Sequence, residues 1–273
     1  MAHVPTVSDV VESLERRYPV GLAAQWDAVG LVCGDPQASV GKVLWAVDPV
    51  EAVVDEAIAE RVDIIVTHHP LLLRGVHSVA PTNASGRIVH RLIRHGIGLY
   101  CAHTNADHAR PGVSDALAAA LGLADVRPLL PDPADARCGT GRVGRLSAAM
   151  SLSDFADLVS ARLPATHHGV RVAGALDARI ETVAVCGGSG DAFLEDAAKA
   201  ADAYVTADLR HHRAQDHLAA GGCALVDVAH WASEWPWLVE AAAALAADLG
   251  GTVESIVSTI VTDPWTAHVG SQR

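Results

Sequence analysis

A five-residue, largely apolar run that is soon followed by a histidine pair constrains the possible fold of this chain more than any other feature of the sequence. Val62-Asp63-Ile64-Ile65-Val66 is rich in β-branched aliphatic residues, as buried strands are, and Thr67-His68-His69-Pro70 follows at once. The imidazoles should therefore lie at the carboxyl end of a core strand, where open α/β sheets bind ligands. Neighbouring residues on an extended chain point to opposite sides. One metal ion would thus take both rings only if the backbone turns, whereas two ions could take one each. Histidines that merely cap the strand are an equally good interpretation of the motif alone.

Length and composition favour an α/β protein of one large unit or two domains. The chain has 273 residues, half of them hydrophobic and only 4% aromatic. Lys and Arg number 20 against 32 Asp and Glu, and the net charge of −12 argues against a nucleic-acid-binding surface. Five scattered cysteines predict neither a disulfide framework nor a CxxC zinc site, and they fit a reduced, cytoplasmic setting. Neither a leader nor a membrane span is expected.

Strands and helices are expected to alternate along the chain. A strand at 42–48, a helix at 51–60 and the strand at 63–67 form the first such unit, which indicates βαβ connections and a largely parallel sheet. The stretch 128–144 is rich in proline and glycine and lacks periodicity, which predicts a domain boundary. The predicted domains are 1–127 with about 235–273, and 128–234.

The second half of the chain repeats the motifs of the first. The segments 202–212 and 223–234 echo two strand-end segments of the first half. In each half an Ala-His pair is followed by an acid four residues on, which places both side chains on one face if the chain turns into a helix. These pairs are His103 with Asp107 and His230 with Glu234. The duplication predicts two similar α/β halves with pseudo-twofold geometry.

A glycine-rich stretch, Gly187-Gly188-Ser189-Gly190, follows a predicted strand and precedes a predicted helix. Backbone N–H groups in such a turn can hold a phosphate, although the lysine of a Walker loop is absent. A tight strand-to-helix turn without a ligand explains the stretch equally well.

Six side chains at predicted strand ends form a candidate metal-ligand set. Four imidazoles and two carboxylates suit zinc, iron or manganese, and two such ions can share a bridging carboxylate or water. One zinc ion would need only three of these groups, so six favour two ions. The candidates are His68, His69, His103, Asp107, His230 and Glu234.

Six stretches spread in order over nearly the whole chain carry a family resemblance. They are 26–31, 67–71, 102–107, 186–190, 206–212 and 230–234. Their sequence resembles the Nif-three-like dinuclear-metal hexameric family, some of whose members are labelled GTP cyclohydrolase 1 type 2.

The resemblance implies two related α/β domains with mixed, largely parallel sheets, in a ring-shaped homo-hexamer whose metal centres face an internal cavity. It implies two divalent ions per protomer, of zinc, iron, manganese or magnesium. Carried over by position, His68 and His230 would bind one ion, His69 and Asp107 the other, and Glu234 would bridge them. His103 would lie alongside as an occasional ligand or a partner of the ligands.

Two classes of function are expected from this site. The first is a metal-dependent hydrolase of a nucleotide or other phosphorylated small molecule, with GTP ring opening as the most concrete reaction. His211 and His212 would then bind substrate or act as general acid, or would merely begin an exposed helix. Three nearby tryptophans would stack on a purine or pack an interface: Trp231, Trp235 and Trp237. The second class is a non-catalytic metal-binding scaffold or metal-handling protein. Neither a membrane nor a nucleic-acid partner is expected.

Overall fold

Two compact units make up the protein in the computed structural model, which describes residues 4–270. The first unit runs to Ala109 and resumes at Leu238–Thr262; the second comprises Arg110–Trp237 and the residues from Asp263 on. These limits differ from the predicted domain limits at 127/128 and 234/235. Both units combine helices with a mixed sheet, as the predicted fold class requires.

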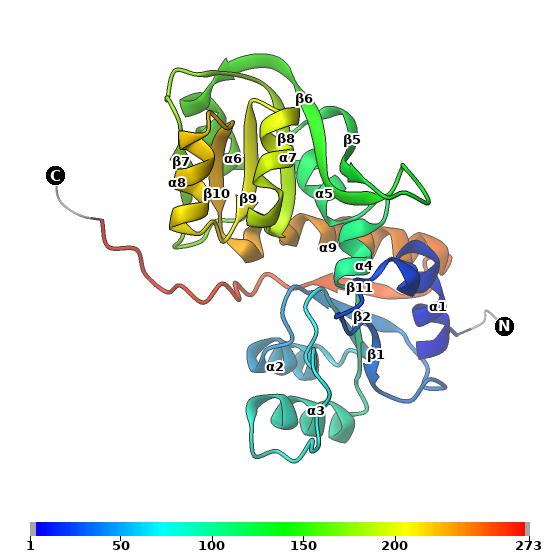
Figure 1. The fold of residues 1–273 in the computed structure, drawn as a ribbon. Helices are drawn as coiled ribbons and strands as arrows, with labels where there is room; N and C mark the ends of the chain where they lie inside the picture. The colour runs from blue at the N-terminus through cyan, green and yellow to red at the C-terminus, as the bar shows by residue number, and fades with distance from the viewer. Residues whose placement is uncertain (1–3, 271–273) are drawn as a thin grey trace. The chain divides into compact units, whose positions relative to one another are not determined.

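The first unit is built on a five-stranded sheet in the order β1-β4-β3-β2-β11. Figure 1 labels β1, β2 and β11 of this sheet. Only the β1–β4 pair is antiparallel; the remaining neighbours pair in parallel. Its strands are β1 (Gly30–Cys33), β2 (Lys42–Ala46), β3 (Ile64–Thr67), β4 (Gly98–Cys101) and β11 (Glu254–Val257). Its helices are α1 (Val7–Arg17), η1 (Val20–Leu22), α2 (Glu51–Glu60), α3 (Ala84–His95) and α4 (Thr104–His108).

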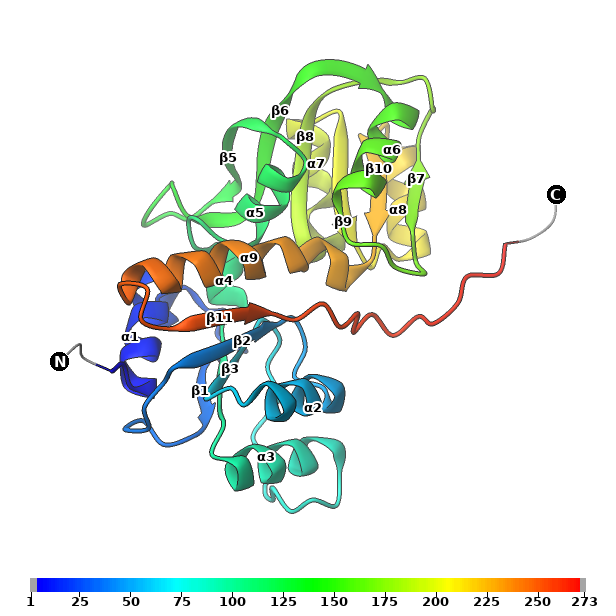
Figure 2. The ribbon, with the colours of Figure 1, turned by 180° about the vertical axis from the view of Figure 1, so that it is seen from behind.

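The predicted central strand is buried along its whole length. All four residues of β3 are buried, because helices cover both faces of the parallel part of the sheet. Helices α2 and α3 lie together on one side of this sheet (Figure 2). Ile65 belongs to one apolar cluster with Ala57 of α2 and Leu92 of α3. A buried Ile or Leu side chain contributes roughly 1.5–3 kcal/mol through removal from water. The strand that carries the histidine pair is thus anchored in the core.

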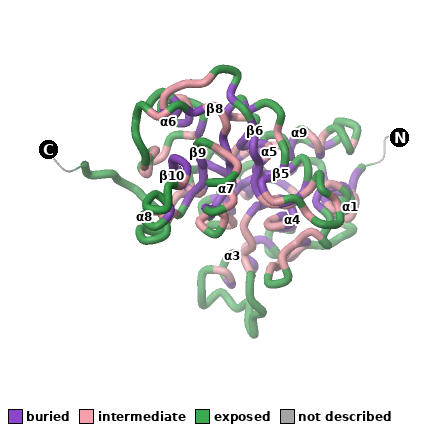
Figure 3. Tube along the Cα trace, turned by 45° about the horizontal axis from the view of Figure 1, so that its top comes forward, coloured by how far each residue is buried: buried purple, intermediate pink, exposed green. Residues whose placement is uncertain are grey.

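The second unit holds a six-stranded sheet in the order β5-β6-β8-β9-β10-β7. Strands β8, β9 and β10 pair in parallel and form a largely buried centre, drawn mainly in purple in Figure 3. The strands are β5 (Ala124–Pro131), β6 (Gly139–Ser151), β7 (Val170–Ala173), β8 (Arg179–Ser189), β9 (Ala203–Ala207) and β10 (Ala224–Val228). The helices are α5 (Val113–Ala120), α6 (Leu152–Arg162), η2 (Asp191–Phe193), α7 (Leu194–Ala200), α8 (His211–Ala219) and α9 (His230–Asp248), the last of which contains the limit between the units.

The stretch 128–144, which the sequence predicts as a domain boundary, holds two strand segments joined by a loop at 132–138. It contains the end of β5 and the start of β6, which pair as antiparallel strands. Strand β5 lies at the sheet edge, where prolines are tolerated because one side of the strand needs no hydrogen bonds. Gly139 has φ +139, and a Cβ there would lie 2.1 Å from the Leu130 carbonyl oxygen. Proline and glycine here shape an edge hairpin.

Each unit contains the same local arrangement of two neighbouring parallel strands followed by polar residues. In the first unit Thr67 of β3 lies opposite Cys101 of β4, and in the second Ala207 of β9 lies opposite Val228 of β10. A histidine two residues beyond β4 and β10 then begins or caps a helix. The repeated sequence motif therefore corresponds to a repeated local structure. Within residues 4–270 there is no helix both long and apolar enough to cross a membrane.

Candidate metal centre

Three predicted ligands come together in the first unit. His68 and His69 follow β3, and His103 follows its parallel neighbour β4. The ring centroids are 5.1 Å apart for His68 and His69, 5.2 Å for His68 and His103, and 5.6 Å for His69 and His103. One nitrogen from each ring lies within 4.8 Å of the others, a grouping that could hold a metal ion.

The backbone turns at the histidine pair, so the two adjacent rings do not point to opposite sides as they would on an extended strand. The His68 amide donates to the Ala46 carbonyl at 3.2 Å, and the His69 amide to the Val47 carbonyl at 2.9 Å. The Thr67 hydroxyl donates to the His69 carbonyl at 2.9 Å. Because these bonds bend the chain after β3, the rings of His68 and His69 both join the three-histidine group that could hold a metal ion.

Each of the three rings is held through its Nδ1 atom by an oxygen of the first unit. A carbonyl or carboxylate oxygen accepts a hydrogen bond, so Nδ1 carries the proton and Nε2 keeps its lone pair. The pairs are His68 with the Ala102 carbonyl at 2.9 Å, His69 with Asp48 Oδ1 at 2.6 Å, and His103 with Asp27 Oδ1 at 2.8 Å.

This arrangement fits a divalent metal ion. Metal-binding histidines commonly present Nε2 to the metal while Nδ1–H bonds to a carboxylate or carbonyl. His68 is only 1% exposed, so its ring is kept out of bulk water. Burial, and next the His68 charge, lower the pKa of His103, although Asp27 opposes the shift. Neutral rings are the form that binds metal.

Asp107 lies beside this group, as the four-residue spacing predicts. His103 caps the short helix α4, and the Asp107 amide donates to the His103 carbonyl at 3.0 Å. Asp107 Oδ1 lies 3.7 Å from Nε2 of His68. A carboxylate is thus added to the three imidazoles, which gives the mixed N/O set that first-row metals accept.

A second pair of predicted ligands lies in the second unit. His230 Nε2 is 3.0 Å from Glu234 Oε1, and His230 Nδ1 is 2.6 Å from Asp208 Oδ2. Burial lowers the pKa of His230, but the Glu234 and Asp208 carboxylates outweigh it and raise the pKa to about 11. The hydrogen bond to His230 in turn lowers the pKa of Asp208. As in the first unit, a histidine ring is held through Nδ1 by an oxygen, here Oδ2 of Asp208.

The glycine-rich stretch makes room for this second pair. Gly187, Gly188 and Ser189 complete strand β8 rather than forming a loop. A Cβ on Gly188 would lie 2.4 Å from Glu234 Oε1 and 3.1 Å from His230 Nε2. The Gly188 amide already donates to the Ser233 hydroxyl at 2.8 Å. Because β8 ends at Ser189 and η2 begins at Asp191, the stretch is a tight strand-to-helix connection. Gly187 and Gly188 within it leave room for the side chains of α9.

His211 and His212 are exposed on the first turn of α8, with ring centroids 5.1 Å apart. An exposed helix start is one of the two interpretations that the sequence allows for this pair, and a role in substrate binding or catalysis is the other. Trp231 and Trp237 are buried, at 4% and 1% exposure, and Trp235 lies 6.4 Å from Trp231 between ring centroids. Trp231 and Trp237 therefore pack in the interior, whereas Trp235 is half-buried.

The sequence did not assign the carboxylates that orient the rings. Asp48 follows β2, the parallel neighbour of β3, so its place at the same sheet edge was the available signal. Asp27 precedes β1, and its other oxygen accepts bonds from the amide and hydroxyl of Thr104. Asp208 follows β9 with φ +58. Each is a polar residue just outside a strand, but only tertiary pairing shows which histidine it serves.

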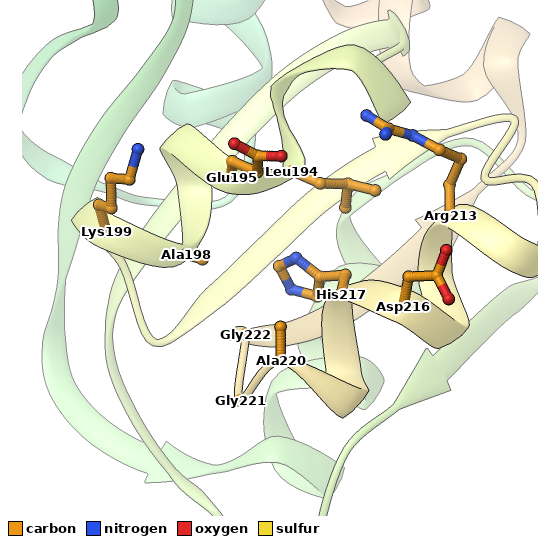
Figure 4. A pocket seen from close by; sticks show the side chains of 10 residues that line it. All are labelled: Leu194, Glu195, Ala198, Lys199, Arg213, Asp216, His217, Ala220, Gly221 and Gly222. Carbon is orange, nitrogen blue, oxygen red and sulfur yellow. The ribbon is translucent and has the colours of Figure 1, made fainter.

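A surface hollow of about 420 Å³ lies elsewhere in the second unit, between α7 and α8 (Figure 4). Its floor includes the buried His217, whose Nε2 bonds to the Cys223 carbonyl at 2.9 Å. Charges of both signs line it, so no ligand class is indicated. The lining consists of Leu194, Glu195, Ala198, Lys199, Arg213, Asp216, His217, Ala220, Gly221 and Gly222, and includes none of the predicted metal or catalytic residues.

Known proteins match this chain along nearly its whole length. The family profile Duf34/NIF3 (NGG1p interacting factor 3) matches residues 5–264. A Streptomyces coelicolor protein named GTP cyclohydrolase 1 type 2 homolog is 50% identical over 274 residues, with 98% of this chain and 96% of that protein covered. A Mycobacterium tuberculosis protein of the same name is 36% identical, with 95% and 96% covered.

Solved structures share the fold. A Bacillus cereus protein described as related to NIF3 superimposes with a TM-score of 0.89 at 26% identity, over 97% of this chain and 99% of that one. A Staphylococcus aureus hypothetical protein gives the same TM-score at 28% identity, over 97% and 100%. The two-sheet architecture is therefore common to all three.

Proposed function

Because this chain belongs to the Duf34/NIF3 family, we propose that it is a metal-dependent hydrolase with two divalent ions per protomer. One observation carries the proposal: the Nδ1–H groups of His68, His69 and His103 are each bonded to an oxygen, so Nε2 is the nitrogen whose lone pair a metal ion would use. Such bonds orient the rings before a metal binds.

We propose the ligand set predicted from the sequence, with His68 and His230 on one ion, His69 and Asp107 on the other, and Glu234 as the bridge. His103 completes the imidazole group of the first unit. When bound, the ions would supply a water of lowered pKa and polarise a carbonyl, imine or phosphoryl oxygen of the substrate. The part of the protein is to direct Nε2 of His68, His69 and His103 away from the oxygens that hold Nδ1. It also keeps His68 and Glu234 out of bulk water, at 1% and 3% exposure.

The proposed substrate is a nucleotide or another phosphorylated small molecule. The name shared by the Streptomyces and Mycobacterium relatives makes GTP the first compound to test. His211 and His212 are proposed to contact the substrate, because their exposed rings lie three and four residues from Asp208, the partner of His230. An imidazole at this place would serve as the general acid of the reaction.

Metal content and turnover measured on one sample test the proposal. Protein purified without chelator or affinity metal should contain two ions per protomer and should hydrolyse one class in a panel of nucleotides and phosphoesters. A His211→Ala, His212→Ala double variant should retain its metal and lose turnover. Two ions without turnover would instead support the scaffold or metal-handling function, and the absence of bound metal would contradict both.

A cytoplasmic homo-hexamer is proposed from the family resemblance. Light scattering coupled to size-exclusion chromatography should give a mass six times that of one chain. A monomeric mass at micromolar concentration would contradict this assembly without bearing on the metal ligands of the first unit.

A further inference from the structure

The segment that follows β11 extends the last strand of the first unit toward the histidine pair. After Val257, which lies opposite Trp45 of β2, the Ser258 amide donates to the Trp45 carbonyl at 2.8 Å. The buried Ser258 hydroxyl donates to Glu56 Oε2 at 2.6 Å, which ties the segment to α2. The segment is thus fixed at its start, in parallel with the end of β2.

Four residues later the segment reaches a carboxylate that orients a predicted ligand. The Thr262 hydroxyl donates to Asp48 Oδ2, while Asp48 Oδ1 accepts from Nδ1 of His69 at 2.6 Å. A threonine 214 residues away in sequence from Asp48 therefore bonds to the same carboxylate as the histidine ring. Thr262, Asp48 and His69 form one chain of hydrogen bonds within the first unit.

The bond from Thr262 restricts the carboxylate to one orientation. The terminal torsion of an aspartate is soft, so a carboxylate held by one hydrogen bond can rotate. With both oxygens engaged, Oδ1 stays directed at His69 Nδ1, which keeps the proton there and the lone pair on Nε2. Two further bonds fix the same histidine: its amide to Val47, and its carbonyl from Thr67. Its backbone and ring are therefore held independently.

We propose that Thr262 is a positioning residue of the metal centre, acting through Asp48 to set the tautomer and orientation of His69. This inference rests on the proposed metal-binding function and extends it to the C-terminal segment Ser258–Thr262. Partners of metal-bound histidines typically contribute 10–100-fold to metal affinity. Since Thr262 acts one bond further out, we expect a loss of about tenfold when its hydroxyl is removed.

Two substitutions separate the hydroxyl from the bulk of the side chain. Thr262→Val keeps the shape and removes the donor, and Thr262→Ser keeps the donor and removes a methyl group. Thr182→Val is the matched control, because the Thr182 hydroxyl also donates to an aspartate, Asp202 Oδ2, at 2.8 Å, in the second unit. Thr262→Ala replaces the valine variant should that variant not fold.

The first readout is Zn²⁺ affinity by chelator competition, and the second is the nitrogen NMR shifts of His69 in metal-free protein. Thr262→Val should weaken Zn²⁺ binding about tenfold and shift His69 toward a mixture of tautomers, while Thr262→Ser and Thr182→Val stay close to wild type. An unchanged His69 tautomer in Thr262→Val would overturn the inference, as would equal losses in the serine and valine variants. Because the NMR readout needs no metal, it tests Thr262 even if the protein binds none.

Discussion

The orientation of each imidazole near the candidate metal centre is fixed by the oxygen atom that its Nδ1 contacts. His68 bonds to a carbonyl, and His69, His103 and His230 bond to carboxylates. Such contacts decide which nitrogen is available to a metal, so they matter as much as the identity of the ligand itself. The residues outside the ligand set are therefore as informative to mutate as those within it.

At Glu234 we expect charge, rather than shape, to govern metal binding. Glu234→Gln preserves the buried side-chain volume but removes the negative charge that two cations would share. Metal analysis should show the loss of at least one ion while the far-UV circular dichroism stays unchanged. Glu240→Gln, at an exposed position of the same helix, is the control. Two ions retained in Glu234→Gln would rule out the bridging role.

Gly188 should tolerate no side chain, because of the carboxylate and imidazole beside it. In Gly188→Ala the new Cβ would meet Glu234 Oε1 at 2.4 Å, so the His230–Glu234 pair must move and metal affinity should fall at least tenfold. Gly169 has the same φ of +67 but nothing within 4 Å of a Cβ, so Gly169→Ala measures the backbone strain alone. That strain costs roughly 1 kcal/mol. Equal metal affinity and equal thermal midpoints in the two variants would mean that the space beside Glu234 is not required.

At the level of elements, neighbouring parallel strands bring ligands and their partners to one edge of a sheet. Strands β2, β3 and β4 are consecutive and parallel, and the residues just beyond them include Asp48, His69 and His103. Strand periodicity predicts each strand separately. The neighbour relation, and hence which carboxylate meets which ring, depends on pairing between segments far apart in sequence.

Helix α1 is attached to α9 by a charged contact whose strength should depend on pH. Asp248 accepts from Arg17 Nη2 at 2.6 Å and from the Ser13 hydroxyl at 2.7 Å, and the Arg17 hydrogen bond lowers the pKa of Asp248. A lowered carboxyl pKa adds stability above the unfolded-state value near 4, and this stability is lost as the pH falls through the folded-state value. Asp248→Asn should cost roughly 1 kcal/mol at pH 7, and the deficit should shrink below about pH 4.

Urea unfolding of both proteins at several pH values measures this difference. Glu12→Gln, at an exposed position of α1, provides a charge-neutralising control. An Asp248→Asn deficit that stays constant down to pH 3 would show that the contact acts through packing rather than charge.

At the scale of the whole molecule, metal binding should raise the free energy of unfolding. Ligand that binds only the folded state at 100 times its Kd adds about 2.7 kcal/mol to the free energy of unfolding. Removal of metal with a chelator should therefore lower the thermal midpoint, and added Zn²⁺ or Mn²⁺ should restore it. In a His68→Ala, His69→Ala variant the chelator and the added ion should both have little effect. A chelator effect of full size in that variant would place the bound metal elsewhere.

The amino-acid sequence by itself determined the class of fold and most of the candidate ligand set. Apolar runs of strand length that end in histidines predict core strands with ligands at their carboxyl ends, and β3 and β4 have that form. The spacing of four residues predicts His230 beside Glu234, and their atoms lie 3.0 Å apart. These features are local, because strand burial and helical turns depend on residues only a few positions apart.

Only the tertiary structure decided what each of these groups touches. The edge hairpin at 128–144, the space that Gly188 leaves for Glu234, and the bond from Thr262 to Asp48 all join segments with no local pattern in common. Hydrogen bonds and close contacts act over a few ångströms and are indifferent to separation along the chain. Which distant segments satisfy them is therefore settled by strand order and packing, which residue periodicity does not encode.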